Sequence, residues 1–181
     1  MRRDFNADDY LHLASALTGE AWGRRTVFLR RAISTAYYAL FYELVQHGAR
    51  RAARTGPLEH QQVIGRWYAH GNFRKAARWV DDLVARRTLP GPVSLLFVDS
   101  TTGTVPADLE ELAKTFSELQ VLRHRADYDP AFQVTREEAL IHVWTAKTGI
   151  EAIRRMDKAN LHQFDMFLLL ALGGERMIKN S

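Results

Sequence analysis

The stretch 123–129, which reads RHRADYD, holds the side chains best suited to chemistry. Arg123 lies next to the apolar positions of a helical pattern. Its side chain should therefore border the expected core and not point freely into water. Asp127 lies four residues later, within reach of Arg123 on a helix, and His124 and Tyr128 form a second pair with the same spacing. An arginine at the edge of a core can offer a planar fork to a phosphate. The alternative is a structural Arg–Asp pair that closes a helix end.

A second group of polar side chains lies in the stretch 30–45, which reads RRAISTAYYALFYELV. Its apolar residues recur at steps of three and four, and its alanines form a separate stripe of small residues. This pattern predicts a helix at the centre of a bundle. Ser34 and Tyr38, one turn apart, place hydroxyl groups on this mostly apolar helix.

The remaining pattern is also helical, so the expected fold class is all-α, a four- to six-helix up-and-down bundle. The first predicted helix runs for about a dozen residues after Asn6 or Asp8. The others span 24–48, 58–87 (in two pieces divided at Gly71-Asn72), 106–127, 135–158 and 161–172. A Thr135–Glu138 capping box marks the start of the helix that ends at about 158. A long irregular or hairpin insertion at about 89–106 interrupts this pattern with three prolines. Within it, SLLFV at 94–98 is a candidate strand.

Composition narrows the class of protein. A chain of 181 residues, 46% of them apolar, fits a single domain 1–181 with a real core. The chain has no cysteine, which excludes disulfides, thiolate metal sites and cysteine nucleophiles. Residues 1–88 carry 15 Lys and Arg against 8 Asp and Glu, whereas residues 89–181 carry 10 against 13. The basic half fits a polyanion such as RNA or an acidic protein, and equally an arginine-rich solvated surface.

The sequence also predicts where the protein works and what it does not need. The longest apolar run, 166–172, is far shorter than the roughly 20 residues that cross a bilayer. The opening MRRDFNADDY has no apolar run typical of a secretory signal. We therefore expect a soluble, cytoplasmic protein with no membrane partner. Its histidines show no metal-ligand spacing and it has no phosphate-cradling glycine loop, so we expect no metal and no cofactor.

Three motifs, taken in order, resemble the HEPN superfamily of helical domains. They are SxxYYALF at 34–41, EHQQVIGRWY at 59–68 and RxxADYD at 123–129. The resemblance covers most of 24–158 and leaves 159–181 as an appended C-terminal helix. It implies a bundle of four or five helices that forms a homodimer, often beside a nucleotidyltransferase-type partner. Many HEPN proteins are metal-independent RNases, including toxins of toxin–antitoxin pairs.

The resemblance also implies roles for single residues. HEPN RNases carry the motif R-x4–6-H, in which the arginine holds the scissile phosphate and the histidine moves protons. Arg123 matches the arginine and His124 the polar residue after it. The motif histidine is absent, because its three permitted positions hold Tyr128, Asp129 and Pro130. His124 and His60 are candidate substitutes.

Three hypotheses follow. The first is a HEPN-like dimer that binds RNA or a nucleotide-type ligand and works beside a nucleotidyltransferase or antitoxin protein. The second is a metal-independent RNase toxin with a non-standard active site, and the third is a non-catalytic structural or antitoxin-like interaction protein. The predicted site residues are Arg123, His124, Asp127 and Tyr128 for phosphate contact or catalysis, and Ser34, Tyr38 and His60 for ligand binding.

Overall fold

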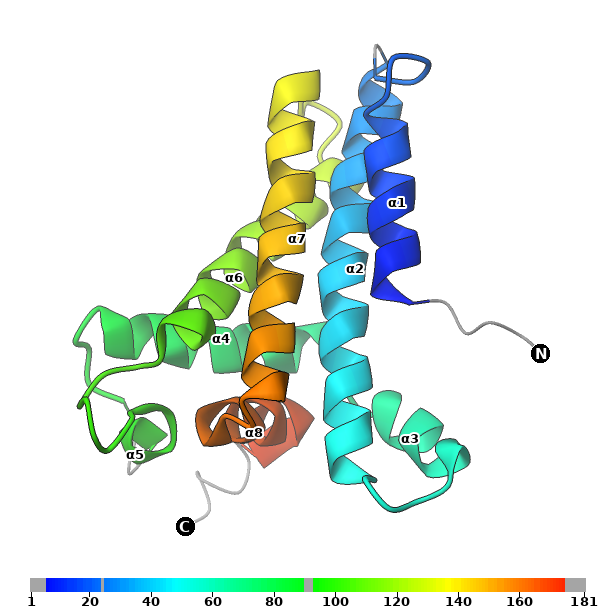
Figure 1. The fold of residues 1–181 in the computed structure, drawn as a ribbon. Coiled ribbons are helices and arrows are strands. Elements are labelled where there is room, and N and C mark those ends of the chain that lie inside the picture. Colours follow the sequence, from blue (N-terminus) through cyan, green and yellow to red (C-terminus); the bar gives the residue numbers. More distant parts are fainter. Residues whose placement is uncertain (1–5, 24, 90–92, 175–181) are drawn as a thin grey trace. The chain divides into compact units, whose positions relative to one another are not determined.

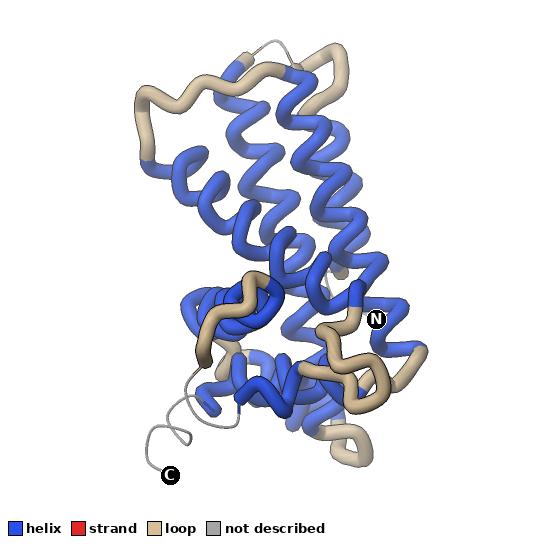
Figure 2. Tube along the Cα trace, turned by 90° about the vertical axis from the view of Figure 1, so that its left-hand side faces the viewer, coloured by secondary structure: helices blue, strands red, loops and turns tan. Residues whose placement is uncertain are grey.

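The computed structural model describes residues 6–23, 25–89 and 93–174, and this part of the chain contains helices and their connections but no strand (Figures 1 and 2). The all-α fold class is therefore confirmed. The elements are α1 (Ala7–Leu17), α2 (Thr26–Ala52), α3 (Leu58–Gly65), α4 (His70–Val84), α5 (Val93–Phe97), α6 (Ala107–Tyr128), α7 (Arg136–Lys158), α8 (His162–Leu169) and a final π-helical turn, η1 (Leu170–Gly174).

The chain divides into two compact units, each made of two separate stretches. Unit 1 comprises Met1–Glu43 and Thr115–Glu151, and unit 2 comprises Leu44–Lys114 and Ala152–Ser181. Helices α2, α6 and α7 each contribute a segment to both units. Unit 2 is the basic one, with 15 Lys and Arg against 10 Asp and Glu, whereas unit 1 carries 10 against 11.

Capping residues fix where the helices of unit 1 begin. The Asn6 side chain accepts a hydrogen bond from the Asp9 amide, and the Asp9 carboxylate accepts one from the Asn6 amide, which forms a capping box for α1. Thr135 and Glu138 form the capping box predicted for α7. Both pairs satisfy amide groups that have no partner within the helix.

The core of unit 1 lies where α2 meets the end of α6 and the start of α7. Its members are Leu29, Ile33, Ala126, Phe132, Val134 and Ala139, with Leu122 packed against them. The alanine stripe of α2 is fully buried, at Ala32, Ala36 and Ala39. Gly149 of α7 lies so close to α6 and α2 that an added Cβ would lie 2.8 Å from Thr115 Cγ2 and 3.1 Å from Leu40 Cδ1. Small residues therefore let the helices of this unit approach closely.

Unit 2 is built around aromatic contacts. Phe73 of α4 is fully buried, stacks on Tyr68 with ring centroids 5.1 Å apart, and lies 6.1 Å from the ring of Phe167 on α8. The phenol ring of Tyr68 occupies space that a side chain at position 48 would need, so Gly48 permits this packing. Helix α8 contacts α4 and α5 within the unit, which explains why it is apolar around most of its surface.

Three details of the sequence prediction are wrong. The segment predicted as a candidate strand forms the short helix α5, because Val93 and Phe97, four residues apart, are both buried on one side. The break between α3 and α4 falls at 66–69, before the predicted Gly71-Asn72, since Tyr68 turns inward there and Gly71 lies in the first turn of α4. Helix α2 continues to Ala52, beyond the predicted end at Gly48.

The structure bears on the membrane prediction only through helix length and hydropathy. Among the described residues, none of the helices combines the length and the apolar character that a bilayer-spanning segment requires.

Candidate functional site

Arg123 and Asp127 lie on the last turns of α6, at the rim of the unit 1 core. Their side chains are 22% and 20% exposed, and Arg123 Nε lies 2.8 Å from Asp127 Oδ2. The Nε–H does not point along that line, so the contact is an ion pair and not a well-formed hydrogen bond. The predicted spacing of four residues thus brings the two side chains together.

Helix α2 supplies hydroxyl groups to both members of this ion pair. Arg123 Nη2 donates a hydrogen bond of 2.9 Å to the Tyr38 hydroxyl, and the Ser34 hydroxyl donates one of 2.5 Å to Asp127 Oδ1. Ser34 is fully buried, so its hydroxyl needs this acceptor. Both carboxylate oxygens of Asp127 are therefore engaged. We call Ser34, Tyr38, Arg123, Asp127 and Tyr128 the Arg123 cluster.

Two aromatic rings flank the guanidinium. The Arg123 Cζ atom lies 5.5 Å from the ring centroid of Tyr38 and 5.5 Å from that of Tyr128, both within the range of a cation–π contact. Burial by itself lowers the pKa of Arg123, but the influence of Tyr38 and Asp127 outweighs it and the pKa lies above its ordinary value. The guanidinium is thus permanently charged. Its Nη1 makes no hydrogen bond or ion pair with any residue that the structure describes.

A hollow of about 610 Å³ opens beside Asp127 in the same unit. Its lining includes Arg30, Arg31 and Phe28 from the start of α2, together with Gln133 from the connection after α6. Arg30 Nε donates a hydrogen bond of 2.8 Å to the Ala126 carbonyl oxygen, which holds this arginine against the end of α6. The hollow therefore adds two cations to the neighbourhood of the cluster.

The sequence prediction missed Arg30 as a site residue. A usable signal was present, because Arg30 lies four residues before Ser34 and so shares its face of the helix. Gln133 had no such signal, since it belongs to an irregular connection whose course depends on the tertiary fold.

The two candidate histidines do not join the guanidinium. His124 is exposed, and its ring lies 5.1 Å from that of Tyr128. His60 belongs to unit 2, where it is exposed and lines a separate hollow with Thr55, Val63 and other residues. In the described part of the chain, neither imidazole makes a hydrogen bond or a ring contact with the Arg123 guanidinium.

The chemistry available to the Arg123 cluster follows from these groups. It offers one fixed cation, two phenol groups and a carboxylate that is already paired. Such a set can bind an anion and stack a flat ring, but a neutral phenol is a weak base. In the residues described, no group of three or more His, Asp or Glu side chains is arranged to hold a metal ion.

The fold and site together define an all-α protein with a partly buried, arginine-centred polar cluster between two helices. Searches with this chain against family models, curated proteins and solved structures each find no match.

Proposed function

We propose that this chain is a HEPN-like helical module that binds RNA, or a nucleotide-type ligand, without cleaving it. One observation carries the proposal: a charged, partly exposed guanidinium is held beside two tyrosine rings, and its Nη1 donates no hydrogen bond to a described residue. Fixing a side chain before the ligand arrives lowers the entropy lost on binding. The resemblance of the motifs at 34–41 and 123–129 to HEPN domains supports the same assignment.

The groups around Arg123 have different roles in the proposed binding. Arg123 contacts a phosphate, Asp127 keeps the guanidinium in place, and Tyr128, which is 63% exposed, offers a face on which a base can stack. Arg30 and Arg31 in the adjacent hollow contact further phosphates of a single strand. The partly buried ion pair limits the affinity, because Asp127 competes with the phosphate for the same cation.

The resemblance extends the proposal to partners. We expect a homodimer that works beside a nucleotidyltransferase or antitoxin protein. An outward stripe on α7 supports self-association, because Leu140, Ile141 and Trp144 are 41%, 58% and 66% exposed at helical spacing. A helix face of this kind is typical of a contact with another protein.

Binding of a labelled single-stranded RNA at 50 and 200 mM salt tests the proposal, with EDTA present and the RNA length checked on a gel. We expect the RNA to stay intact, retention to fall as salt rises, and Arg123→Gln to weaken retention about tenfold. Arg136→Gln is the matched control, since Arg136 is an arginine of the same unit whose Nε donates to the Thr18 carbonyl oxygen.

The other outcomes are equally informative. Equal RNA binding by wild type and Arg123→Gln, with a lower melting temperature of the variant, would assign the cluster a purely structural role. Cleavage of the RNA by the wild type, lost in Arg123→Gln but kept in Arg136→Gln, would replace binding with the RNase hypothesis.

A further inference from the structure

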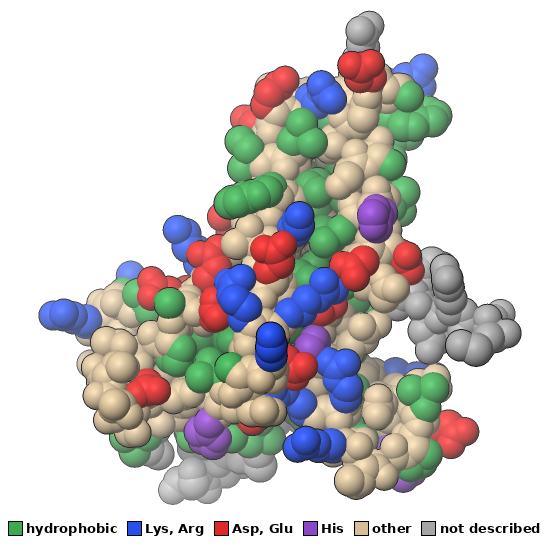
Figure 3. Space-filling model, in the orientation of Figure 1, with side chains coloured by type: hydrophobic (Ala, Val, Ile, Leu, Met, Phe, Trp, Pro, Cys, Tyr) green, Lys and Arg blue, Asp and Glu red, His purple; other side chains and the backbone are tan. Residues whose placement is uncertain are grey.

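Unit 2 contains a hollow of about 630 Å³ that the proposed function does not use. It lies among the end of α2, the end of α7 and helix α8, and its volume falls within the range of small-molecule sites. All of its lining residues belong to unit 2. Figure 3 shows Lys and Arg side chains gathered over the C-terminal ends of α2 and α7.

Three arginines of different availability line this hollow. Arg51 is 19% exposed and pairs with Asp157, 2.9 Å away, and with Asp165. Arg50 is 53% exposed and bonds to the buried His47 as well as lying 3.5 Å from Asp157. Arg54 follows α2, is exposed, and makes no hydrogen bond or ion pair with the residues described. The two carboxylates are thus already balanced, and Arg54 remains as an uncommitted cation.

Two neutral polar groups also face the hollow. Tyr68 lines the hollow with only 6% of its surface exposed, and its hydroxyl donates no hydrogen bond to a residue of the described chain. Asn160 is an exposed lining residue that adopts a left-handed conformation (φ 49°) in the turn after α7, where its backbone N–H donates to the Asp157 carbonyl oxygen.

The rest of the lining is apolar and comes mainly from the C-terminal segment. Met166, Leu169 and Leu172 contribute side chains that are partly or largely exposed. One wall of the hollow is therefore apolar, and another carries cations and hydroxyl or amide groups. A ligand with a flat apolar ring and a phosphate matches both walls.

We propose that this hollow is a separate binding site for a mononucleotide. Arg54 and Arg50 contact the phosphate, the Tyr68 hydroxyl and Asn160 supply neutral hydrogen bonds, and the base lies against Met166 and Leu169. Guanidinium groups that are free to pair with phosphate give strong, charge-assisted hydrogen bonds. The site differs from the Arg123 cluster in both its residues and its unit.

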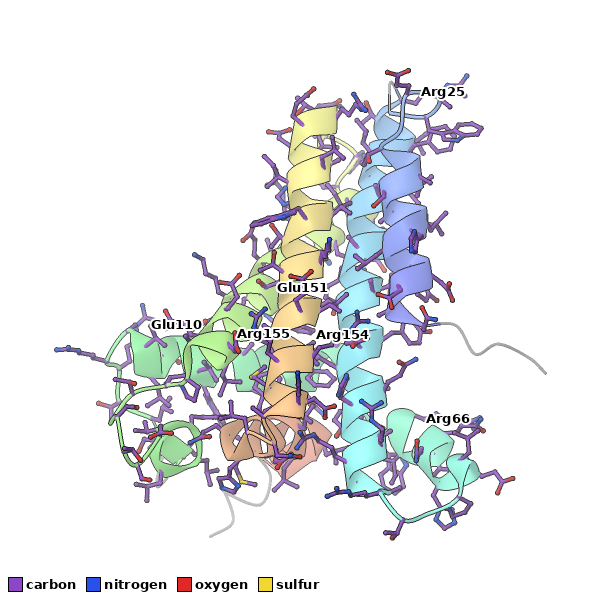
Figure 4. The ribbon with its side chains drawn as sticks, viewed as in Figure 1. Arg25, Arg66, Glu110, Glu151, Arg154 and Arg155 are labelled. Atoms are coloured by element: carbon purple, nitrogen blue, oxygen red, sulfur yellow. The ribbon has the colours of Figure 1, made fainter. Side chains whose placement is uncertain are left out.

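Calorimetric titration of the full chain with adenosine 5′-monophosphate tests this inference. We expect saturable binding, with no heat from adenosine or inorganic phosphate at the same concentration, and a loss of about tenfold in affinity in Arg54→Gln. Arg66→Gln is the matched control, because Arg66 is an exposed arginine of unit 2 at the end of α3 that does not line the hollow (Figure 4). Tyr68→Phe should weaken binding while leaving the packing against Phe73 in place.

The outcome of the nucleotide titration does not depend on whether the RNA proposal holds. Binding of the nucleotide that persists in Arg123→Gln but weakens in Arg54→Gln supports a second site, whether or not RNA binds. The inference is overturned if the nucleotide does not bind, if Arg54→Gln binds as tightly as wild type, or if dodecyl phosphate saturates the site and the nucleotide does not.

Discussion

Asp127→Asn separates a binding role of the Arg123 cluster from a structural one. At 2.8 Å and an effective dielectric of about 20, the gross attraction between Arg123 and Asp127 is about 6 kcal/mol. Desolvation of the two partly buried groups offsets most of it, so we expect a net loss of about 1–3 kcal/mol in the free energy of unfolding. Asparagine keeps an oxygen that can accept the Ser34 hydrogen bond, so the helices retain that contact.

The same change should strengthen RNA binding. Without the carboxylate, Arg123 is released to a phosphate and the site loses one negative charge. The phosphate that Arg123 contacts then meets a positive charge that no carboxylate offsets. One more phosphate charge neutralised steepens the salt dependence of single-strand binding by about 0.7, so the ratio of affinities at 50 and 200 mM salt rises by a factor of about 2.6. A variant that is less stable and binds RNA more tightly is a combination that a purely structural pair does not produce.

The assay is RNA retention across a salt series, beside chemical denaturation of the same samples. Asp108→Asn is the matched control, because it removes the same charge from an Arg–Asp pair in unit 2, where Arg155 Nη2 lies 2.7 Å from Asp108 Oδ1. The reasoning fails if Asp127→Asn binds RNA more weakly than wild type, or if Asp108→Asn strengthens binding by the same factor.

Three further predictions address partners and stability. Trp144→Glu places a charge on the exposed stripe of α7 and should convert a dimer to a monomer in sedimentation, whereas a wild type that sediments as a monomer contradicts the proposed homodimer. Burial lowers the pKa of His142 below its ordinary 6.5, against the opposing effect of Glu118 and Glu138. The unfolded chain therefore binds a proton at His142 more readily than the folded chain, so the free energy of unfolding should fall as pH drops below about 6.5. His142→Gln should flatten the dependence of that free energy on pH below about 6.5, and an unchanged slope would refute the assignment. Asn6→Ala removes the α1 cap and should cost about 1 kcal/mol, seen as faster amide exchange in the first turn of α1, with Asn72→Ala as a comparison outside any cap hydrogen bond in the structure described.

The sequence predicted most helices because their signals are local. Capping boxes and three- to four-residue periodicity are written in neighbouring residues, as at Asn6 and Thr135. The apolar run before Asp99 was harder, since five residues fit a strand or a helix equally until the burial of Val93 and Phe97 is known. The inward turn of Tyr68, which sets the break between α3 and α4, depends on Gly48 and Phe73 and so on tertiary packing.

The site was predictable in part for the same reason. The pairing of Arg123 with Asp127 is a matter of spacing along one helix, and the structure has it. The bonds from Ser34 and Tyr38 join residues 93 and 85 positions away, respectively, so no local pattern could establish them. The hydroxyls were expected near the site through the family resemblance alone.

The division of the chain into two units determines what truncated fragments can contain. The stretches of the two units alternate along the chain, so no single truncation isolates one unit from the other. A fragment ending before Thr115 would expose the apolar face of α2 that the missing stretch covers, at Leu29 and Ile33. Contacts that close such distant stretches form late and slowly, so newly made chains should become protease-resistant only after the ribosome has released nearly all of α7.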